Sequence, residues 1–288
     1  MSIVARIEAA LAAARRRSAA FDHFWRAMDR YGEVLGARLA AAIAYYGFFA
    51  VFALALVAYW AFGFVLRRSI DVRLAVDDFL NQNLPFLNIQ QISDSSDTVG
   101  IVGLAVLVLT GIAWIEAIRS SQRFIYGVPQ QPGNIVIRRI VDLAVMVVVF
   151  LLLAVSVAAV DGLETLLRWL APAPVVTVVS WVLTAFLNVV LAAALLVAVP
   201  RLRMHPRRFL PAVVLVAVGV TVLNTIGREY IVRADRNPAY TVVTGAVGLL
   251  LYLYLLNQLL LFGAALAATS THGRVIDLSA PNNHSDPS

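Results

Sequence analysis

Hydrophobic residues gather in six long runs along this chain, separated by short polar segments. The first run, residues 39–66, contains no charged residue in 28 positions. As a helix it would extend about 42 Å, which exceeds the roughly 30 Å thickness of the hydrocarbon core of a bilayer. The pattern therefore predicts an all-α protein, a polytopic membrane helical bundle. We expect its six transmembrane helices at residues 39–66, 99–118, 140–160, 175–199, 210–226 and 241–268.

Two polar segments have the spacing of amphipathic helices. In residues 1–38, large hydrophobic side chains recur at helical intervals with charged residues on the other faces. We expect this helix on the membrane surface, its arginines facing anionic lipid. Packing against the cytoplasmic side of the bundle is the alternative. Residues 67–98 predict a second interfacial or re-entrant helix on the opposite, extracytoplasmic side.

The distribution of basic residues predicts the orientation. All 23 of them are arginines, and sixteen fall in segments on the same side as the N-terminus. By the positive-inside rule, both termini are expected in the cytoplasm and the chain in the plasma membrane. Residues 269–288 are polar, and we expect a disordered cytoplasmic tail there.

The amino-acid composition argues against several classes of protein for this chain. The chain is 61% hydrophobic and 14% charged, whereas a soluble domain is roughly 45–50% apolar and 25% charged. It has no cysteine and four scattered histidines, so we expect no metal, no cofactor and no enzyme activity. The net charge of +6 would favour nucleic-acid binding in a soluble protein. Here the arginines lie in loops, where topology explains them, and no nucleic-acid partner is expected.

Polar residues within the apolar runs are candidates for a substrate path, since each is costly in lipid unless it is hydrated or partnered. Asn188 and Asn257 fall near the middle of their runs, where transporter sites usually lie. Interhelical hydrogen bonds are the structural alternative for each residue. The candidates are Tyr45, Tyr46, Asn188, Asn224, Thr225, Asn257 and Gln258.

Charged residues gather at both ends of the predicted bundle. Such clusters could hold phosphate headgroups through bidentate hydrogen bonds, and determining the topology is their simpler role. Asp142 lies four residues after Arg138, so a local ion pair is expected for it. The candidate residues are Glu116, Arg119, Arg123, Arg138 and Arg139 on the cytoplasmic side, and Arg228, Glu229 and Arg233 on the other.

Three segments resemble the YihY/BrkB family of bacterial inner-membrane proteins, known earlier as ribonuclease BN. They read RAMDRYGEVLGARLAAAIAYYGFFAVFALALV, RSSQRFIYGVP and AYTVVTGAVGLLLYLYLLNQLLLFGAALAA. The resemblance covers about residues 21–269 and implies a six-span inner-membrane protein. Lipid or solute export and maintenance of the cell envelope are the roles it suggests.

The chain departs from that family at two places. Ala50 and Ala53 stand where the family commonly has a serine and then a proline in the first span. Residues 263–268 read GAALAA, where the family often has Gly-Ala-Glu-Leu-Asn-Ala. A mechanism that depends on that glutamate, or on a proline kink, therefore cannot be transferred to this chain.

Three functions remain open from the sequence. The first is a transporter or flippase-like protein for a lipid, another amphiphile or a solute, and the second is an envelope or assembly factor without a substrate path. Ribonuclease activity is the third and is not expected, because Asp77 and Asp78 form the only close acid pair and lie on the side away from RNA. Membrane lipids are the expected partners. Small faces at Gly245, Gly248 and Gly263 also suit helix contact, including self-association.

Overall fold

The computed structural model describes residues 12–68, 89–170, 172–234 and 238–279. Six of its helices contain segments long and apolar enough to cross a membrane: Gly36–Ala58, Gly100–Ile125, Ile135–Leu167, Pro174–Ala198, Pro206–Gly227 and Gly245–Ala268. The predicted polytopic bundle of six membrane helices is confirmed. The helices are α2 (Ala19–Glu33), α3 (Gly36–Arg68), α5 (Ile89–Ile125), α6 (Ile135–Leu170), α7 (Ala173–Ala193), η1 (Ala194–Ala198), α8 (Pro206–Ala234) and α9 (Pro238–Ala268). Two short strands are β1 (Leu202–Arg203) and β2 (Ile276–Asp277).

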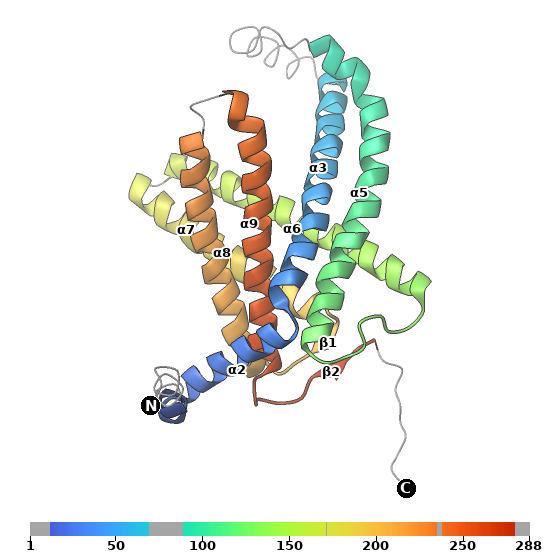
Figure 1. The fold of residues 1–288 in the computed structure, drawn as a ribbon. Helices are drawn as coiled ribbons and strands as arrows, with labels where there is room; N and C mark the ends of the chain where they lie inside the picture. Colours follow the sequence, from blue (N-terminus) through green and yellow to red (C-terminus); the bar gives the residue numbers. More distant parts are fainter. Residues whose placement is uncertain (1–11, 69–88, 171, 235–237, 280–288) are drawn as a thin grey trace. The chain divides into compact units, whose positions relative to one another are not determined.

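Contacts divide the chain into two compact units. The larger comprises Met1–Ala44 and Ile115–Ser288, and the smaller is Tyr45–Trp114. Within the larger unit, α6 packs on α7, α7 on α8, and α8 on α9, while α2 packs on α9. Figure 1 shows α8 and α9 running side by side. The functional site described below lies wholly in this unit.

Glycine allows the close approach of α8 and α9. A Cβ atom on Gly263 would lie 2.6 Å from Cγ2 of Val216, and one on Gly219 would lie 2.8 Å from Cδ1 of Leu259. Both distances are shorter than real Cβ contacts, so either substitution would push the helices or their side chains apart. The small face at Gly263 therefore serves packing within the chain.

Helix α2 begins at a side-chain cap and lies against α9. The Ser18 hydroxyl accepts a hydrogen bond from the amide of Phe21, satisfying one free donor of the first turn. Phe24 contacts Phe262 edge to face, and His23 Nε2 lies 2.8 Å from the carbonyl oxygen of Leu266. These contacts agree with the second of the two expectations for this segment, a helix packed on the bundle. The location of α2 at the membrane surface stays a prediction.

The smaller unit contains the parts of α3 and α5 that face each other. Glycines let the helices approach, since a Cβ atom on Gly100 would lie 2.1 Å from the ring of Trp60. Ala50 and Ala53, which replace the serine and proline expected from the resemblance, are buried. The second predicted amphipathic helix falls largely on residues 69–88, which lie outside the described residues.

The end of α7 has an irregular backbone. Its last turns widen into the π-helix η1, in which the amide of Val199 donates to the carbonyl of Ala194. Such widened turns are frequent at functional sites. Arg201 follows with φ +58°, an uncommon conformation for a residue other than glycine.

Residues 270–279 form a strap that returns to this turn. Strand β2 pairs antiparallel with β1, and the amide of Leu278 donates to the carbonyl of Arg201. Arg208 anchors the start of the strap, because its guanidinium donates to the carbonyls of Ala267, Ala268 and Gly273. The tail was expected to be disordered from residue 269. Its first part is instead held by backbone pairing and by a guanidinium placed at the C-terminus of α9.

Candidate functional site: a buried arginine cluster and an apolar groove

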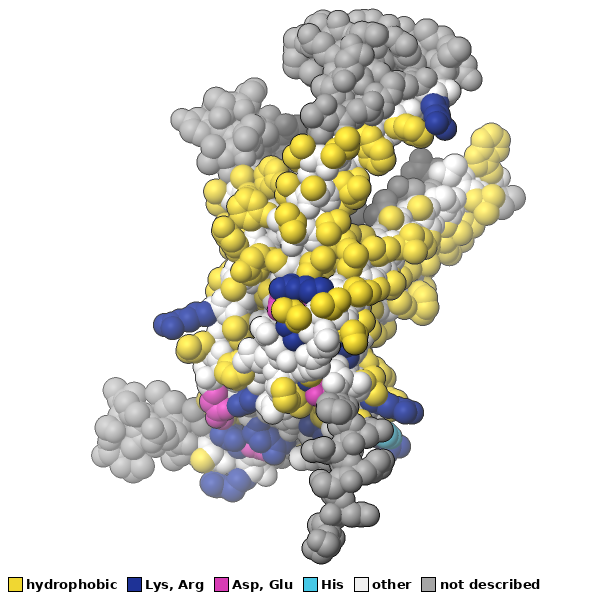
Figure 2. Space-filling model, turned by 90° about the vertical axis from the view of Figure 1, so that its right-hand side faces the viewer, with side chains coloured by type: hydrophobic (Ala, Val, Ile, Leu, Met, Phe, Trp, Pro, Cys, Tyr) yellow, Lys and Arg dark blue, Asp and Glu magenta, His cyan; other side chains and the backbone are white. Residues whose placement is uncertain are grey.

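Four arginines lie together at the end of the larger unit that carries β1 and β2. We call Arg119, Arg123, Arg138 and Arg201 the arginine cluster. Arg119 and Arg123 are fully buried on the last turns of α5, Arg138 is 5% exposed in the first turns of α6, and the side chain of Arg201 is 17% exposed. On the face drawn in Figure 2, the few acidic side chains lie among basic ones, and hydrophobic side chains cover much of the remaining surface.

Asp142 is the anionic centre of the cluster. Its carboxylate is fully buried and accepts from Arg119 Nε at 3.0 Å and Arg119 Nη2 at 3.2 Å. Arg201 Nη2 donates to the same carboxylate at 2.6 Å. The expected local pair with Arg138 is not what the structure shows, since Arg138 Nη2 donates to Gln131 Oε1 at 3.3 Å. Asp142 thus joins α5, α6 and the turn after η1.

Arg123 binds the strap. Its Nη1 donates to Asp277 Oδ1 at 3.0 Å, and its Nη2 donates to the other carboxylate oxygen, which makes the pair bidentate. Burial by itself raises the pKa of Asp277. Hydrogen bonds from Arg123 and from the Ser279 amide, with the charge of Arg123, outweigh burial, so the pKa of Asp277 is lowered.

A loop between α5 and α6 closes over the cluster through its carbonyl groups. Arg123 Nε donates to the Pro129 carbonyl at 2.6 Å, and Arg119 Nη1 donates to the Gln130 carbonyl at 3.0 Å. Gly127 and Gly133 have φ values of +69° and +71° at the two ends of this loop. Because glycine adopts that conformation without strain, the loop can turn back so that its carbonyls face the guanidinium groups.

The charges of the cluster affect one another. Burial is the main cause that lowers the pKa of the Arg201 guanidinium, and Asp142 opposes it. The positive charges of Arg119, Arg123 and Arg138 lower that pKa further. The four arginines therefore share one electrostatic environment. The outer pair of Arg139 with Glu116 lies beside them and is more exposed, with 43% of the Arg139 side chain open.

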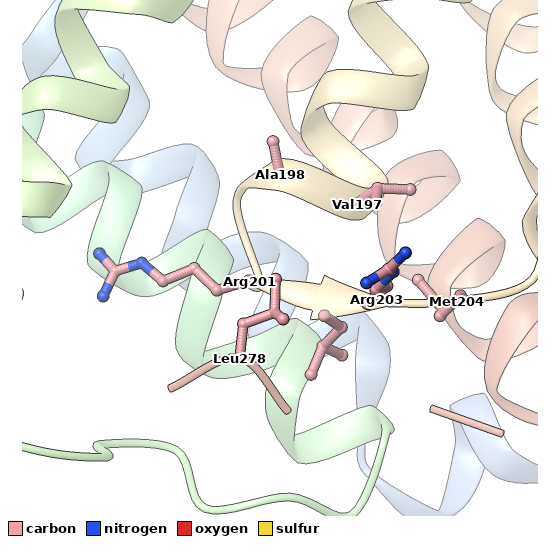
Figure 3. Close-up of a pocket in the computed structure, with 7 residues that line it drawn as sticks. Val197, Ala198, Arg201, Arg203, Met204 and Leu278 are labelled. Atoms are coloured by element: carbon pink, nitrogen blue, oxygen red, sulfur yellow. The ribbon is translucent and has the colours of Figure 1, made fainter. Parts of the chain in front are cut away.

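Next to the cluster lies a cavity of about 450 Å³ lined by Val197, Ala198, Arg201, Leu202, Arg203, Met204 and Leu278. Figure 3 shows the Arg201 side chain extending away from the other labelled residues, and Arg203 on the opposite side. The strap contributes Leu278 to the wall. The cavity therefore lies beneath the C-terminal strap, beside the Arg201 stem.

A second hollow, the α2 groove, has a volume of about 540 Å³ and lies between α2, α8 and α9. Its lining is almost wholly apolar: Phe24, Met28, Tyr31, Gly219, Val222, Leu223, Ile226, Leu255, Gln258, Leu259 and Phe262. The polar exceptions are Gln258 and the hydroxyl of Tyr31, which is buried without a hydrogen-bond partner among the described residues. Burial, with a contribution from Tyr254, raises the pKa of Tyr31 to about 12, so this hydroxyl stays a neutral donor.

The predicted path residues are mostly engaged in hydrogen bonds. Asn188 donates to the Thr221 hydroxyl at 3.1 Å across α7 and α8, and Asn224 accepts from the Tyr252 hydroxyl at 2.6 Å across α8 and α9. Buried Asn257 donates to the Leu253 carbonyl of its own helix.

The remaining candidates are scattered. Thr225 donates its hydroxyl hydrogen to the carbonyl one turn earlier in α8. Tyr45 and Tyr46 are exposed on α3 in the smaller unit, where the ring of Tyr45 contacts that of Phe49 edge to face. Arg228, Glu229 and Arg233 belong to the last turns of α8, and their side chains lie outside the described part.

Four further residues of these sites were not among the candidates. The spacing predicts a local partner for Asp142, the polar composition predicts a disordered tail around Asp277, and Tyr31 has no charge that would mark it. For Arg201 a signal existed, because the segment RLRMHPRR carries four arginines without an acid. Such a run at the end of an apolar helix indicates either topology or an anion nearby, and sequence alone does not separate the two.

Comparison with known protein families shows to which family this chain belongs. The family described as virulence factor BrkB matches residues 27–287. The chain belongs to the BrkB family. This BrkB-family chain is 26% identical over 282 residues to inner membrane protein YhjD of Escherichia coli (strain K12), covering 89% of this chain and 83% of YhjD. It is 25% identical over 289 residues to an uncharacterized protein of Dickeya dadantii (strain 3937), covering 91% and 87% of the two chains. No solved structure matches it.

Proposed function

We propose that this BrkB-family protein moves an anionic amphiphile, such as a lipid, between the two leaflets of the bacterial inner membrane. In this proposal α2 and both termini face the cytoplasm. The α2 groove is the observation that carries it. A volume of about 540 Å³ falls within the roughly 300–1,000 Å³ of most ligand sites, and the lining suits a hydrocarbon chain.

The position of the groove supports this function. On α9 it runs from Leu255 to Phe262, and seven residues of helix extend about 10 Å. Leu255 lies near the middle of the membrane segment Gly245–Ala268, whereas Phe262 lies where α2 packs. An acyl chain in the groove would therefore reach from the level of α2 to the middle of the bilayer.

A polar pair lies at the midplane end of the groove. Asn224 follows the lining residue Leu223 on α8, and Tyr252 lies one turn before Leu255 on α9. Their hydrogen bond joins the two helices there. Separating these helices would extend the groove toward the other leaflet, so we assign Asn224 and Tyr252 a gating role, and Gln258 contact with the polar part of the substrate.

An envelope or assembly factor without transport is the second candidate. The observation that favours it is that Asn188 and Asn224 both make interhelical hydrogen bonds, which hold the bundle closed. In such a protein the groove would hold a structural lipid permanently.

Translocation in proteoliposomes separates these functions. The purified protein is reconstituted, and the movement of fluorescent anionic and neutral lipids between leaflets is measured with a membrane-impermeant quencher. Accelerated movement of an anionic lipid is expected, and Val222→Trp, which fills the groove, is expected to abolish it. Val182→Trp is the matched control on the exposed face of α7, because Val182 is 66% exposed and does not line the groove.

Cysteine labelling tests the path itself, because the chain has no native cysteine. Single cysteines at Asn188, Asn224 and Asn257 are treated with impermeant thiol reagents from each side. Labelling within the spans would support a water-accessible path. No accelerated movement of any anionic lipid or solute, together with labelling confined to loop controls, would refute transport and leave the structural role.

A further inference from the structure

The arginine cluster has more positive charge than its surroundings balance. Four arginines face two carboxylates, those of Asp142 and Asp277. Arginine stays charged in proteins, and a buried charge is costly unless it is paired and hydrogen-bonded. Arg119 and Arg201 share Asp142, and Arg123 pairs with Asp277, so the four arginines carry two more positive charges than the carboxylates that contact them. Arg138 contacts no carboxylate among the described residues.

Neutral carbonyl groups compensate only part of this excess. Gln130, Pro129 and Pro200 offer carbonyl oxygens to Arg119 and Arg123. The C-terminal end of α5 adds a partial negative charge of roughly half an electron. Arg138 lies instead in the first turns of α6, where the helix dipole is positive and adds to the excess.

Two guanidinium groups also keep unused donors. Nε of Arg138 and Nε of Arg201 are buried and have no hydrogen-bond partner in the described part of the chain. Arg138 makes one long bond, to Gln131, and Arg201 uses Nη2 for Asp142. A buried donor without an acceptor is destabilising, so these nitrogen atoms are suited to an additional acceptor that carries negative charge.

We infer that the arginine cluster binds a phosphate-type oxyanion through Arg138 and Arg201. Guanidinium groups match phosphate oxygens in geometry and can donate two parallel hydrogen bonds. The Arg201 side chain is partly exposed and its stem borders the cavity beneath the strap, which offers a small ion a route to the cluster. The inference goes beyond transport, since the site binds the anion whether or not a lipid is moved.

The same phosphate chemistry can come from a free ion or from a lipid headgroup, and two measurements distinguish these sources. The full-length protein in micelles of a neutral detergent is heated with increasing inorganic phosphate, against chloride at equal ionic strength. In parallel, its unfolding is compared in nanodiscs of neutral lipid with and without phosphatidic acid. Binding to the folded state raises the unfolding temperature by mass action.

A saturable, phosphate-specific rise in micelles identifies a free ion. A rise with phosphatidic acid alone identifies a headgroup. Absence of both effects overturns the inference.

Variants locate the site. Arg138→Gln is expected to weaken anion binding at least about tenfold, the loss of one charge-assisted hydrogen bond. Arg207→Gln is the matched control, because Arg207 is an exposed arginine at the start of α8 outside the cluster, and wild-type affinity is expected.

A second variant, Gln131→Glu, tests the same inference if Arg138→Gln fails to fold. It introduces a carboxylate beside Nη2 of Arg138, supplying the missing negative charge from within the chain. We expect this variant to be more stable than the wild type without ligand and to bind the anion at least about tenfold more weakly. Wild-type anion affinity in Gln131→Glu would contradict the inference.

Discussion

We predict that Asp142→Asn strongly destabilises the folded protein, because Asp142 is a buried carboxylate paired with two arginines. The substitution preserves the size of the side chain and one carbonyl oxygen, and it removes the charge that Arg119 and Arg201 share. Because Asp142 and Arg119 are both fully buried, water cannot replace the lost carboxylate. Breaking a buried pair by removing one partner costs about 3–5 kcal/mol. The equilibrium constant for unfolding should therefore rise roughly a hundred- to a few-thousand-fold.

The assay is equilibrium unfolding in mixed detergent micelles, followed by the fluorescence of the native tryptophans. Glu116→Gln serves as the control, since it removes the carboxylate of the more exposed pair with Arg139. A partly exposed pair is worth about 0–1 kcal/mol. If Asp142→Asn cost no more than Glu116→Gln, the buried carboxylate would not stabilise the cluster, and the electrostatic reasoning would be refuted.

Three further predictions concern packing, the interhelical bonds and pH. Gly263→Ala should destabilise the protein by about 1–3 kcal/mol, because the new Cβ atom would meet Val216. Gly245→Ala is the control and should not destabilise it, because no atom lies within 4 Å of the position of its Cβ. Equal thermal stability of the two variants would contradict this reasoning. Asn188→Leu and Thr221→Val should show a coupling of about 0.6–1.7 kcal/mol in a double-mutant cycle of unfolding, and a coupling near zero would count against the hydrogen bond. The lowered pKa of Asp277 means that the strap gains stability above the ordinary aspartate pKa of about 3.9 and loses it as pH falls below that value. The hydrogen-exchange protection of residues 270–279, measured against the intrinsic exchange rate at each pH, should therefore fall in acid, and Asp277→Asn should remove that pH dependence.

Local sequence patterns are sufficient to predict the membrane helices, but they do not predict which residues form ion pairs. Long apolar runs locate membrane helices because a helix satisfies its own backbone within one segment. The partner of a charged residue has no such local signature. Spacing predicts Arg138, four residues away, as the partner of Asp142, but its partners Arg119 and Arg201 lie 23 and 59 residues away in sequence.

The candidate site was therefore predictable only in part. Arg119, Arg123 and Arg138 stood out by their density near the ends of apolar runs. The groove could not be foreseen, because its lining residues are ordinary apolar residues that meet only when α2 packs on α9.

The pairing of Arg123 with the strap has a consequence for biosynthesis. Asp277 lies 154 residues beyond Arg123, and a ribosome makes the chain from its N-terminus. The carboxylate that neutralises Arg123 is therefore synthesised only after all six membrane helices. Until then the guanidinium depends on carbonyl groups of the nearby loop and of Pro200. Neutralisation of Arg123 thus depends on the synthesis of residue 277, and a nascent chain that stops before this residue keeps the buried guanidinium without its carboxylate partner.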